Sequence, residues 1–178
     1  LMRSSAASDV YKRQVMIISS KINSLSASMA SFLFFVYSAV TGVTLSAIFL
    51  MYTQESIATT FGITAGTFGA TALFGYVTKK DLSKMGSILF MLLIGLIIAS
   101  VVNMFLKNDT MMWILTYVGI VIFVGLTAYD MQKLKKIAHS IDDDESSIAK
   151  FAVLGALTLY LDFINLFLRL LQIFGKKR

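Results

Sequence analysis

The sequence contains no cysteine and no proline, and only 15% of its 178 residues are charged. Without cysteine the chain can form no disulfide and do no thiol chemistry, and without proline its helices carry no proline kinks. A soluble domain of this size has about a quarter of its residues charged. Together with a hydrophobic content of 57%, this composition favours a membrane protein over a water-soluble domain.

Long uncharged stretches lie between short groups of charged residues. A transmembrane helix needs about 20 consecutive apolar residues, and five stretches meet that length if one with two charged residues, 151–175, is included. We therefore expect an all-α, polytopic membrane helical bundle whose spans cover 28–53, 56–78, 86–106, 111–132 and 149–175. The connections are short, which is typical of neighbouring helices in one bundle.

The first 14 residues differ from the rest. They are polar, begin with Leu1 and show no helical apolar periodicity. No apolar segment with a small-residue cleavage site follows, so we predict no signal peptide. We expect residues 1–14 to be a leader that is non-native or disordered, and 15–178 to be a fragment of one transmembrane domain. A native disordered tail is the alternative.

The distribution of basic residues predicts the orientation, because loops rich in lysine and arginine stay in the cytoplasm. The second and fourth connections carry three lysines each, whereas the first carries none and the third only Lys107. We expect the second and fourth connections to face the cytoplasm. The net charge of +6 then reflects basic loops near anionic lipid headgroups, and no nucleic-acid partner is expected.

The last predicted span carries a stripe of polar residues. Thr158, Asp162, Asn165, Arg169 and Gln172 follow one another at steps of four, three, four and three residues. That spacing places all five on one helical face. A charged side chain in the middle of a bilayer costs from about 3 to more than 10 kcal/mol, so we expect this helix to lie inside the bundle with its stripe toward a polar cavity.

A second acid, Asp130, lies near the expected cytoplasmic end of the fourth span. One hypothesis pairs it with Lys133 at the membrane interface, one turn further on. The other brings Asp130 and Asp162 face to face. Two carboxylates in contact resist double ionisation, so such a pair could hold a shared proton, sense pH and exchange the proton for a cation. The expected helix ends place the two acids at different depths, so the pairing needs a tilt or a later start of the last helix.

Two membrane aspartates are also found in intramembrane aspartyl proteases, which activate water with a pair of carboxyl groups. Those enzymes carry Gly-x-Gly-Asp at the second acid and a Pro-Ala-Leu segment downstream. Residues 159–162 are Leu-Tyr-Leu-Asp, and the chain has no proline. No nucleophile elbow, P-loop or dinucleotide fingerprint is present either. We do not expect an enzyme.

The fourth connection contains the acidic run 142–145 and the single histidine, His139. The run lacks the alternating ligands, central glycine and distant glutamate of an EF-hand loop. A lone histidine lacks the partners that a metal site needs. We interpret both as solvated surface.

Four segments resemble the Bax inhibitor-1 family, also called the transmembrane Bax inhibitor motif family, in its bacterial members: YSAVTGVTL (37–45), GYVTKKDLS (75–83), AYD (128–130) and LYLDFINLF (159–167). The resemblance covers about 15–178. It implies seven helices with the last surrounded by the other six, so that the first and most of the second would be missing from this chain. It also implies a multi-pass protein of the bacterial inner membrane.

The resemblance implies that Asp130 and Asp162 form a pH-sensitive pair that gates a calcium leak, with Ca²⁺ as a transient ligand and transported ion and no other cofactor. Thr158, Asn165 and Arg169 would support the pair. In some members a basic residue of the second helix latches it, and here only Lys21 is basic in that region. The alternative function is a non-transporting regulator that binds a membrane protein such as a protease or a stress-signalling complex.

Overall fold

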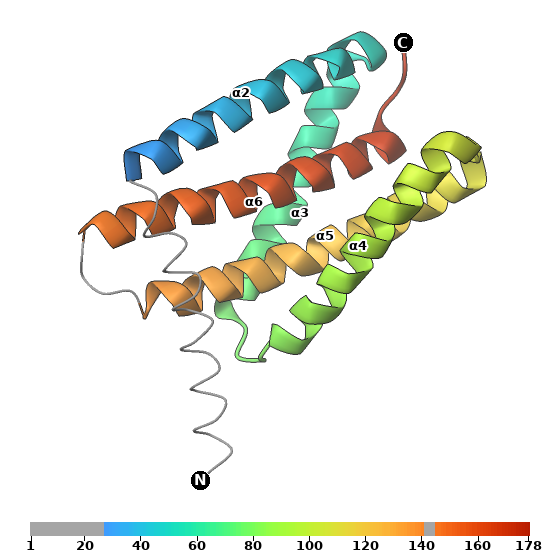
Figure 1. The fold of residues 1–178 in the computed structure, drawn as a ribbon. Helices are drawn as coiled ribbons and strands as arrows, with labels where there is room; N and C mark the ends of the chain where they lie inside the picture. Colours follow the sequence, from blue (N-terminus) through green and yellow to red (C-terminus); the bar gives the residue numbers. More distant parts are fainter. Residues whose placement is uncertain (1–26, 141–144) are drawn as a thin grey trace.

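The computed structural model describes residues 27–140 and 145–178, and within them the chain forms five helices (Figure 1). Their bounds are α2 (Ala27–Met51), α3 (Gln54–Val77), α4 (Ser83–Leu106), α5 (Asp109–Ala138) and α6 (Glu145–Phe174). All five are long and apolar enough to cross a membrane, since 24 residues rise about 36 Å against a hydrocarbon core of about 30 Å. The predicted all-α membrane bundle is confirmed. The leader 1–14 and Lys21 lie outside the described residues.

The two longest helices, α5 and α6, occupy the middle of the bundle (Figure 1). Helix α2 packs along α6, α4 packs along α5, and α3 packs against both central helices. Aromatic rings of α6 pack edge-to-face against rings of its neighbours. The ring centroid of Tyr160 lies 6.0 Å from that of Phe34 on α2, and the ring centroid of Phe163 lies 5.3 Å from that of Phe61 on α3. The polar stripe predicted an inner position for α6, and α6 shares that position with α5.

The apolar core lies where α4, α5 and α6 meet. Its buried members come from all three helices: Leu89, Leu96, Ile122, Phe123, Leu126, Leu166 and Leu170. The turn between α4 and α5 is short because Lys107 adopts the left-handed conformation with φ 50° and Asn108 caps α5 by accepting a hydrogen bond from the Met111 N–H at 2.9 Å. This tight hairpin aligns the two helices along the site described below.

Two predicted helix ends were wrong. The fourth span was expected to end at residue 132, but α5 continues to Ala138, and the fifth was expected to start at 149, but α6 starts at Glu145. The lysines after Asp130 end the uncharged run without ending the helix, because a helix that leaves the membrane keeps its own hydrogen bonds. Asp130 therefore lies eight residues, or about 12 Å, before the end of α5, and Asp162 lies 17 residues, or about 26 Å, after the start of α6. The observed helix ends alone thus do not remove the expected difference in depth.

The C-terminal residues return to the turn between α2 and α3. The Thr53 N–H donates to the Lys176 carbonyl at 3.0 Å, and the Arg178 N–H donates to the Met51 carbonyl at 3.0 Å. The start of α6 lies beside the end of α5, at the opposite end of the bundle (Figure 1). Helix α6 thus runs the full length of the bundle, as the sequence predicted.

Small residues on α3 do not pack where their spacing suggested. The four-residue repeat that includes Gly62 and Gly66 predicts a close helix contact, yet a Cβ at either glycine would meet none of the described residues within 4 Å. Gly75, further along α3, does make such a contact: a Cβ there would overlap the backbone carbonyl of Ala128 on α5. The buried face of α3 carries Thr60 and Thr64, both fully buried. Threonine side chains, like glycine, are small enough to let two helices pack closely.

Candidate functional site

A cavity of about 840 Å³ opens between α4, α5 and α6. Its wall is mostly apolar, and its charged side chains come from the two central helices: Asp130 and Lys133 from α5, Asp162 and Arg169 from α6. Helix α4 contributes no charged residue to the wall. We call this space the carboxylate cavity. All the predicted site residues line it: Asp130, Asp162, Thr158, Asn165 and Arg169.

The structure brings Asp130 and Asp162 together. Their carboxyl groups lie within hydrogen-bond reach of each other across the contact between α5 and α6. Asp162 is 6% exposed, and its Oδ2 atom is buried without a hydrogen-bond partner among the described residues. Buried polar atoms in native proteins nearly always have a partner, so this oxygen marks a place where a proton, a water or a cation could bind.

Lys133 does not form the interfacial salt bridge that one hypothesis gave it. Its ammonium lies 5.8 Å from the ring centroid of Tyr129, and no salt bridge joins it to Asp130 in the described part of the chain. Its charge still acts on Asp130 through space. The Tyr129 ring in turn lies so close to Gly86 of α4 that a Cβ there would overlap it. Lys133 is therefore a wall residue of the cavity.

The polar stripe of α6 faces the cavity and α5, as its spacing predicted. Thr158 Oγ1 donates to the Leu154 carbonyl at 3.0 Å, and Asn165 Nδ2 donates to the Leu161 carbonyl at 2.8 Å. Both bonds stay within α6, which leaves the carbonyl oxygen of the Asn165 amide available to the cavity. Gln172 differs, because its Oε1 accepts a hydrogen bond at 2.6 Å from Thr116 Oγ1 on α5.

The carboxylate pair alone could hold a cation only weakly. In the described ranges, no three side chains of His, Cys, Asp or Glu gather as a metal-binding group. Ca²⁺ takes six to eight oxygen ligands in stable sites. Two carboxyl groups with the neighbouring Asn165 and Thr158 oxygens, and water for the rest, suit a cation that binds briefly and leaves.

A second polar cluster joins α5 to the connection between α3 and α4. Gln132, which is 6% exposed, accepts a hydrogen bond from the Leu82 N–H at 2.9 Å and donates one to the Lys80 carbonyl at 2.8 Å. Lys136 Nζ lies 2.7 Å from Asp81 Oδ1. Lys136 and the Ser83 hydroxyl hold the pKa of Asp81 at about 2, well below its usual 3.8. We call these contacts the loop clasp.

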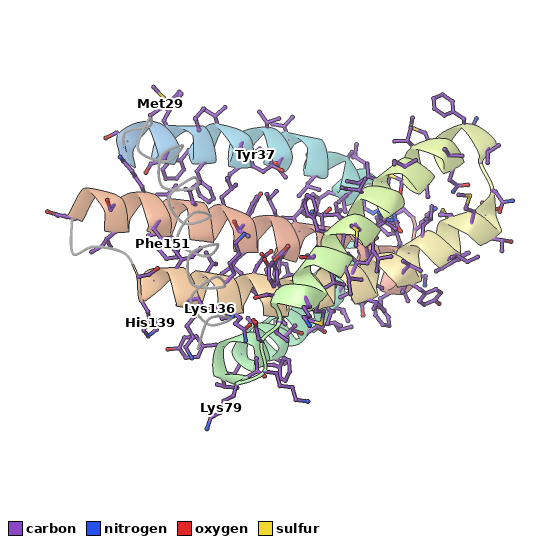
Figure 2. All side chains as sticks on the ribbon, turned by 60° about the horizontal axis from the view of Figure 1, so that its bottom comes forward. Met29, Tyr37, Lys79, Lys136, His139 and Phe151 are labelled. Carbon is purple, nitrogen blue, oxygen red and sulfur yellow. The ribbon has the colours of Figure 1, made fainter. Side chains whose placement is uncertain are left out.

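The loop clasp has no local signal in the sequence. Gln132 and Lys136 lie on one helical face four residues apart, but their partners Lys80 and Asp81 are about 50 residues earlier in the chain. Figure 2 shows Lys79, Lys136 and His139 at the same end of the molecule, which agrees with the predicted common side for the two lysine-rich connections. His139 is exposed, as expected. Residues 142–144 lie outside the described residues, and Glu145 begins α6.

Comparison with known proteins shows similarity along nearly the whole chain. The family model described as inhibitor of apoptosis-promoting Bax1 matches residues 14–178. The inner membrane protein YbhL of Escherichia coli K12 is 58% identical over 165 residues, which are 92% of this chain and 70% of that protein.

Relatives from distant bacteria share the similarity. An uncharacterized protein of Borreliella burgdorferi is 52% identical over 164 residues, covering 92% of this chain and 71% of its own length. An uncharacterized membrane protein of Streptococcus pyogenes serotype M1 is 38% identical over 144 residues, covering 81% of this chain and 62% of its own. The predicted resemblance and the predicted location in a bacterial inner membrane are confirmed.

Proposed function

This chain belongs to the Bax inhibitor-1 family, and on that premise we propose that it is a pH-sensitive leak pathway for cations, Ca²⁺ in particular, with no enzymatic activity. Asp130 and Asp162 bind the proton or the cation. The observation that carries the proposal is the pair of carboxyl groups from different helices that lie within hydrogen-bond reach of each other in one cavity, where Asp162 Oδ2 has no hydrogen-bond partner among the described residues.

A pair of carboxylates in a low-dielectric cavity can exchange a proton for a cation. When both groups are ionised, they repel each other, and either a shared proton or a bound cation relieves that repulsion. The cavity also holds the charges of Lys133 on α5 and Arg169 on α6. Both positive charges oppose the entry of a cation. Protons and cations then compete for the carboxyl pair, and this competition sets which of them occupies it. Acidic residues within a membrane commonly mark ion or proton pathways.

The direct test is calcium flux into liposomes that contain the purified protein and a calcium dye, measured across a range of pH. We expect a flux that depends on pH in the unsubstituted protein. Asp162→Asn and Asp130→Asn should each remove the pH dependence, because an amide cannot exchange a proton. Glu55→Gln is the matched control, since this acid lies in the exposed first turn of α3, away from the cavity.

Flux that is absent at every pH, or that keeps its pH dependence in both cavity variants, would refute the leak. Co-purification of a membrane protease or another membrane protein that survives both substitutions, in the absence of flux, would favour the non-transporting regulator instead.

A further inference from the structure

A second, smaller cavity lies beside the α4–α5 turn. Its volume is about 370 Å³, and its wall includes Asn103, Lys107 and Asp109. We call it the turn pocket. It shares two wall residues with the carboxylate cavity, Ser100 of α4 and Arg169 of α6. The two spaces therefore meet at these two side chains.

The Arg169 side chain crosses α5 where that helix has a glycine. A Cβ at Gly119 would lie 3.0 Å from Arg169 Nε and 3.3 Å from its Cδ. Distances this short are tighter than ordinary van der Waals contact, so any larger residue at 119 would push the arginine aside. The glycine lets the guanidinium lie against α5 at the junction of the two spaces. Across the junction, the Ser100 hydroxyl is buried, and the part of the chain that the structure describes offers it no hydrogen-bond partner.

Arg169 carries a full positive charge and forms no salt bridge within residues 27–140 and 145–178. A guanidinium stays protonated in proteins. Along α6 it lies seven residues, or about 10 Å, from Asp162. A cation moving between the turn pocket and the carboxyl pair would have to pass this charge at close range.

We propose that Arg169 is a charge barrier that separates the turn pocket from the carboxylate cavity and limits the passage of cations between them. The proposal deepens the proposed function and depends on it for its physiological meaning. The barrier itself is a statement about access, so it can be measured without any calcium flux.

The absence of cysteine from the sequence allows a labelling test with single introduced thiols. Asn103→Cys places a thiol in the turn pocket, and Asn165→Cys places one in the carboxylate cavity, one turn inward of Arg169. Each cysteine variant is made in three backgrounds at position 169. These are the native Arg169, Arg169→Met, which removes the charge but keeps an unbranched side chain, and Arg169→Lys, which keeps the charge. The full-length chain is labelled in spheroplasts and in inverted membrane vesicles, which expose opposite faces.

The probes are Ag⁺, a small thiol-reactive cation, and methyl methanethiosulfonate, a neutral reagent. The face from which Ag⁺ reacts with Asn103→Cys identifies the side of the turn pocket. From that side we expect Ag⁺ to modify Asn165→Cys at least tenfold faster in Arg169→Met, because Arg169 lies one turn, or about 6 Å, along α6 from this position and a unit charge at that distance acts strongly at a protein-like dielectric constant. Arg169→Lys should stay slow, and the neutral reagent should change much less.

Equal Ag⁺ rates at Asn165→Cys with Arg169 and with Arg169→Met would overturn the barrier. So would an equal acceleration for the neutral reagent, which would show that the substitution opened space without removing an electrostatic obstacle. Gel-filtration profiles of all variants check that they fold. Refutation of the barrier leaves an aspartate-dependent calcium flux standing. Conversely, a tenfold Ag⁺ effect without any calcium flux would support the barrier and refute the leak.

Discussion

Helix α5 contributes to two polar regions, the loop clasp and the carboxylate cavity, which lie within one turn of each other. They differ in whether their buried polar groups are hydrogen bonded. In the loop clasp, both ends of the buried Gln132 amide are hydrogen bonded to the backbone of the α3–α4 connection. In the carboxylate cavity, Asp162 is as deeply buried as Gln132, yet its Oδ2 has no hydrogen-bond partner in the described ranges. Around the clasp the helices touch closely, whereas a large space remains beside the acids.

This difference separates a group that holds the fold from one that is available for function. An amide with two satisfied bonds stabilises the position of a loop, and its removal leaves the backbone groups unpaired. A buried carboxyl oxygen without a partner costs stability, and on the proposed function a proton or a cation would bind it. The four predictions below test that contrast, from the largest expected effect to the smallest.

Gly75→Ala should destabilise the protein by about 2 kcal/mol or more, because the added methyl would overlap the Ala128 carbonyl of α5 and the backbone cannot yield cheaply. Thermal unfolding in detergent measures the change. Gly62→Ala is the matched control on the same helix, since no described residue lies within 4 Å of its Cβ position. Equal unfolding temperatures for the two variants would show that α3 and α5 do not pack as described.

Gln132→Leu should destabilise the protein by about 2 kcal/mol. The substitution removes two hydrogen bonds and leaves the Leu82 N–H, part of a residue that is 8% exposed, without its acceptor. Chemical unfolding measures the loss. We expect the pH dependence of calcium flux to survive in this variant, and its disappearance would argue that the clasp and the carboxyl pair act as one site.

Asp162→Asn should have the opposite sign and raise the stability by about 1 kcal/mol, as replacements of strained functional groups commonly do. The neutral amide removes the repulsion with Asp130 and the cost of a buried charge. The same unfolding assay at neutral pH measures the gain. A clear loss of stability would mean that the Asp162 carboxylate stabilises the fold, and the contrast with Gln132 would fail.

Asp81→Asn should have the smallest effect, below about 1 kcal/mol at pH 7, because the Asp81–Lys136 pair is exposed to solvent and screened. The pKa of Asp81 is lowered to about 2 in the folded protein from 3.8. Its stabilising contribution is therefore present above pH 3.8 and disappears as the pH falls through about 2. Unfolding experiments should show a small difference in stability between Asp81→Asn and the unsubstituted protein at pH 7, and no difference near pH 2. An effect at pH 7 as large as that of Gln132→Leu would contradict this ranking.

The sequence predicted the parts of the fold that depend on local pattern. Long apolar runs, four of them uncharged, located all five helices, and the spacing from Thr158 to Gln172 located the inward face of α6. The charge pattern predicted the end of α5 wrongly, because Lys133 and Lys136 end the uncharged run but lie inside the helix. Hydropathy marks where a chain leaves the membrane, whereas backbone hydrogen bonding decides where its helix ends.

Contacts between distant residues were beyond prediction for a different reason. The spacing of Gly62 and Gly66 predicted a helix interface, but the close contacts are at Gly75 and Gly86, which show no such repeat. Gln132 gave no signal, because its partners are backbone groups about 50 residues away. The pairing of Asp130 with Asp162 came from a family resemblance. The expected helix ends argued against it, because positions along each helix do not give the tilt and offset of one helix against the other.

The central claim is that Asp130 and Asp162 share a site where protons bind. Infrared difference spectroscopy of the protein in lipid, between neutral and acidic pH, detects the carbonyl band of a protonated carboxyl group directly. We predict a band that titrates with pH in the unsubstituted protein and in Glu55→Gln, and that is lost or shifted in both Asp130→Asn and Asp162→Asn. A titrating band that is identical in all four proteins would contradict a shared proton site at this pair.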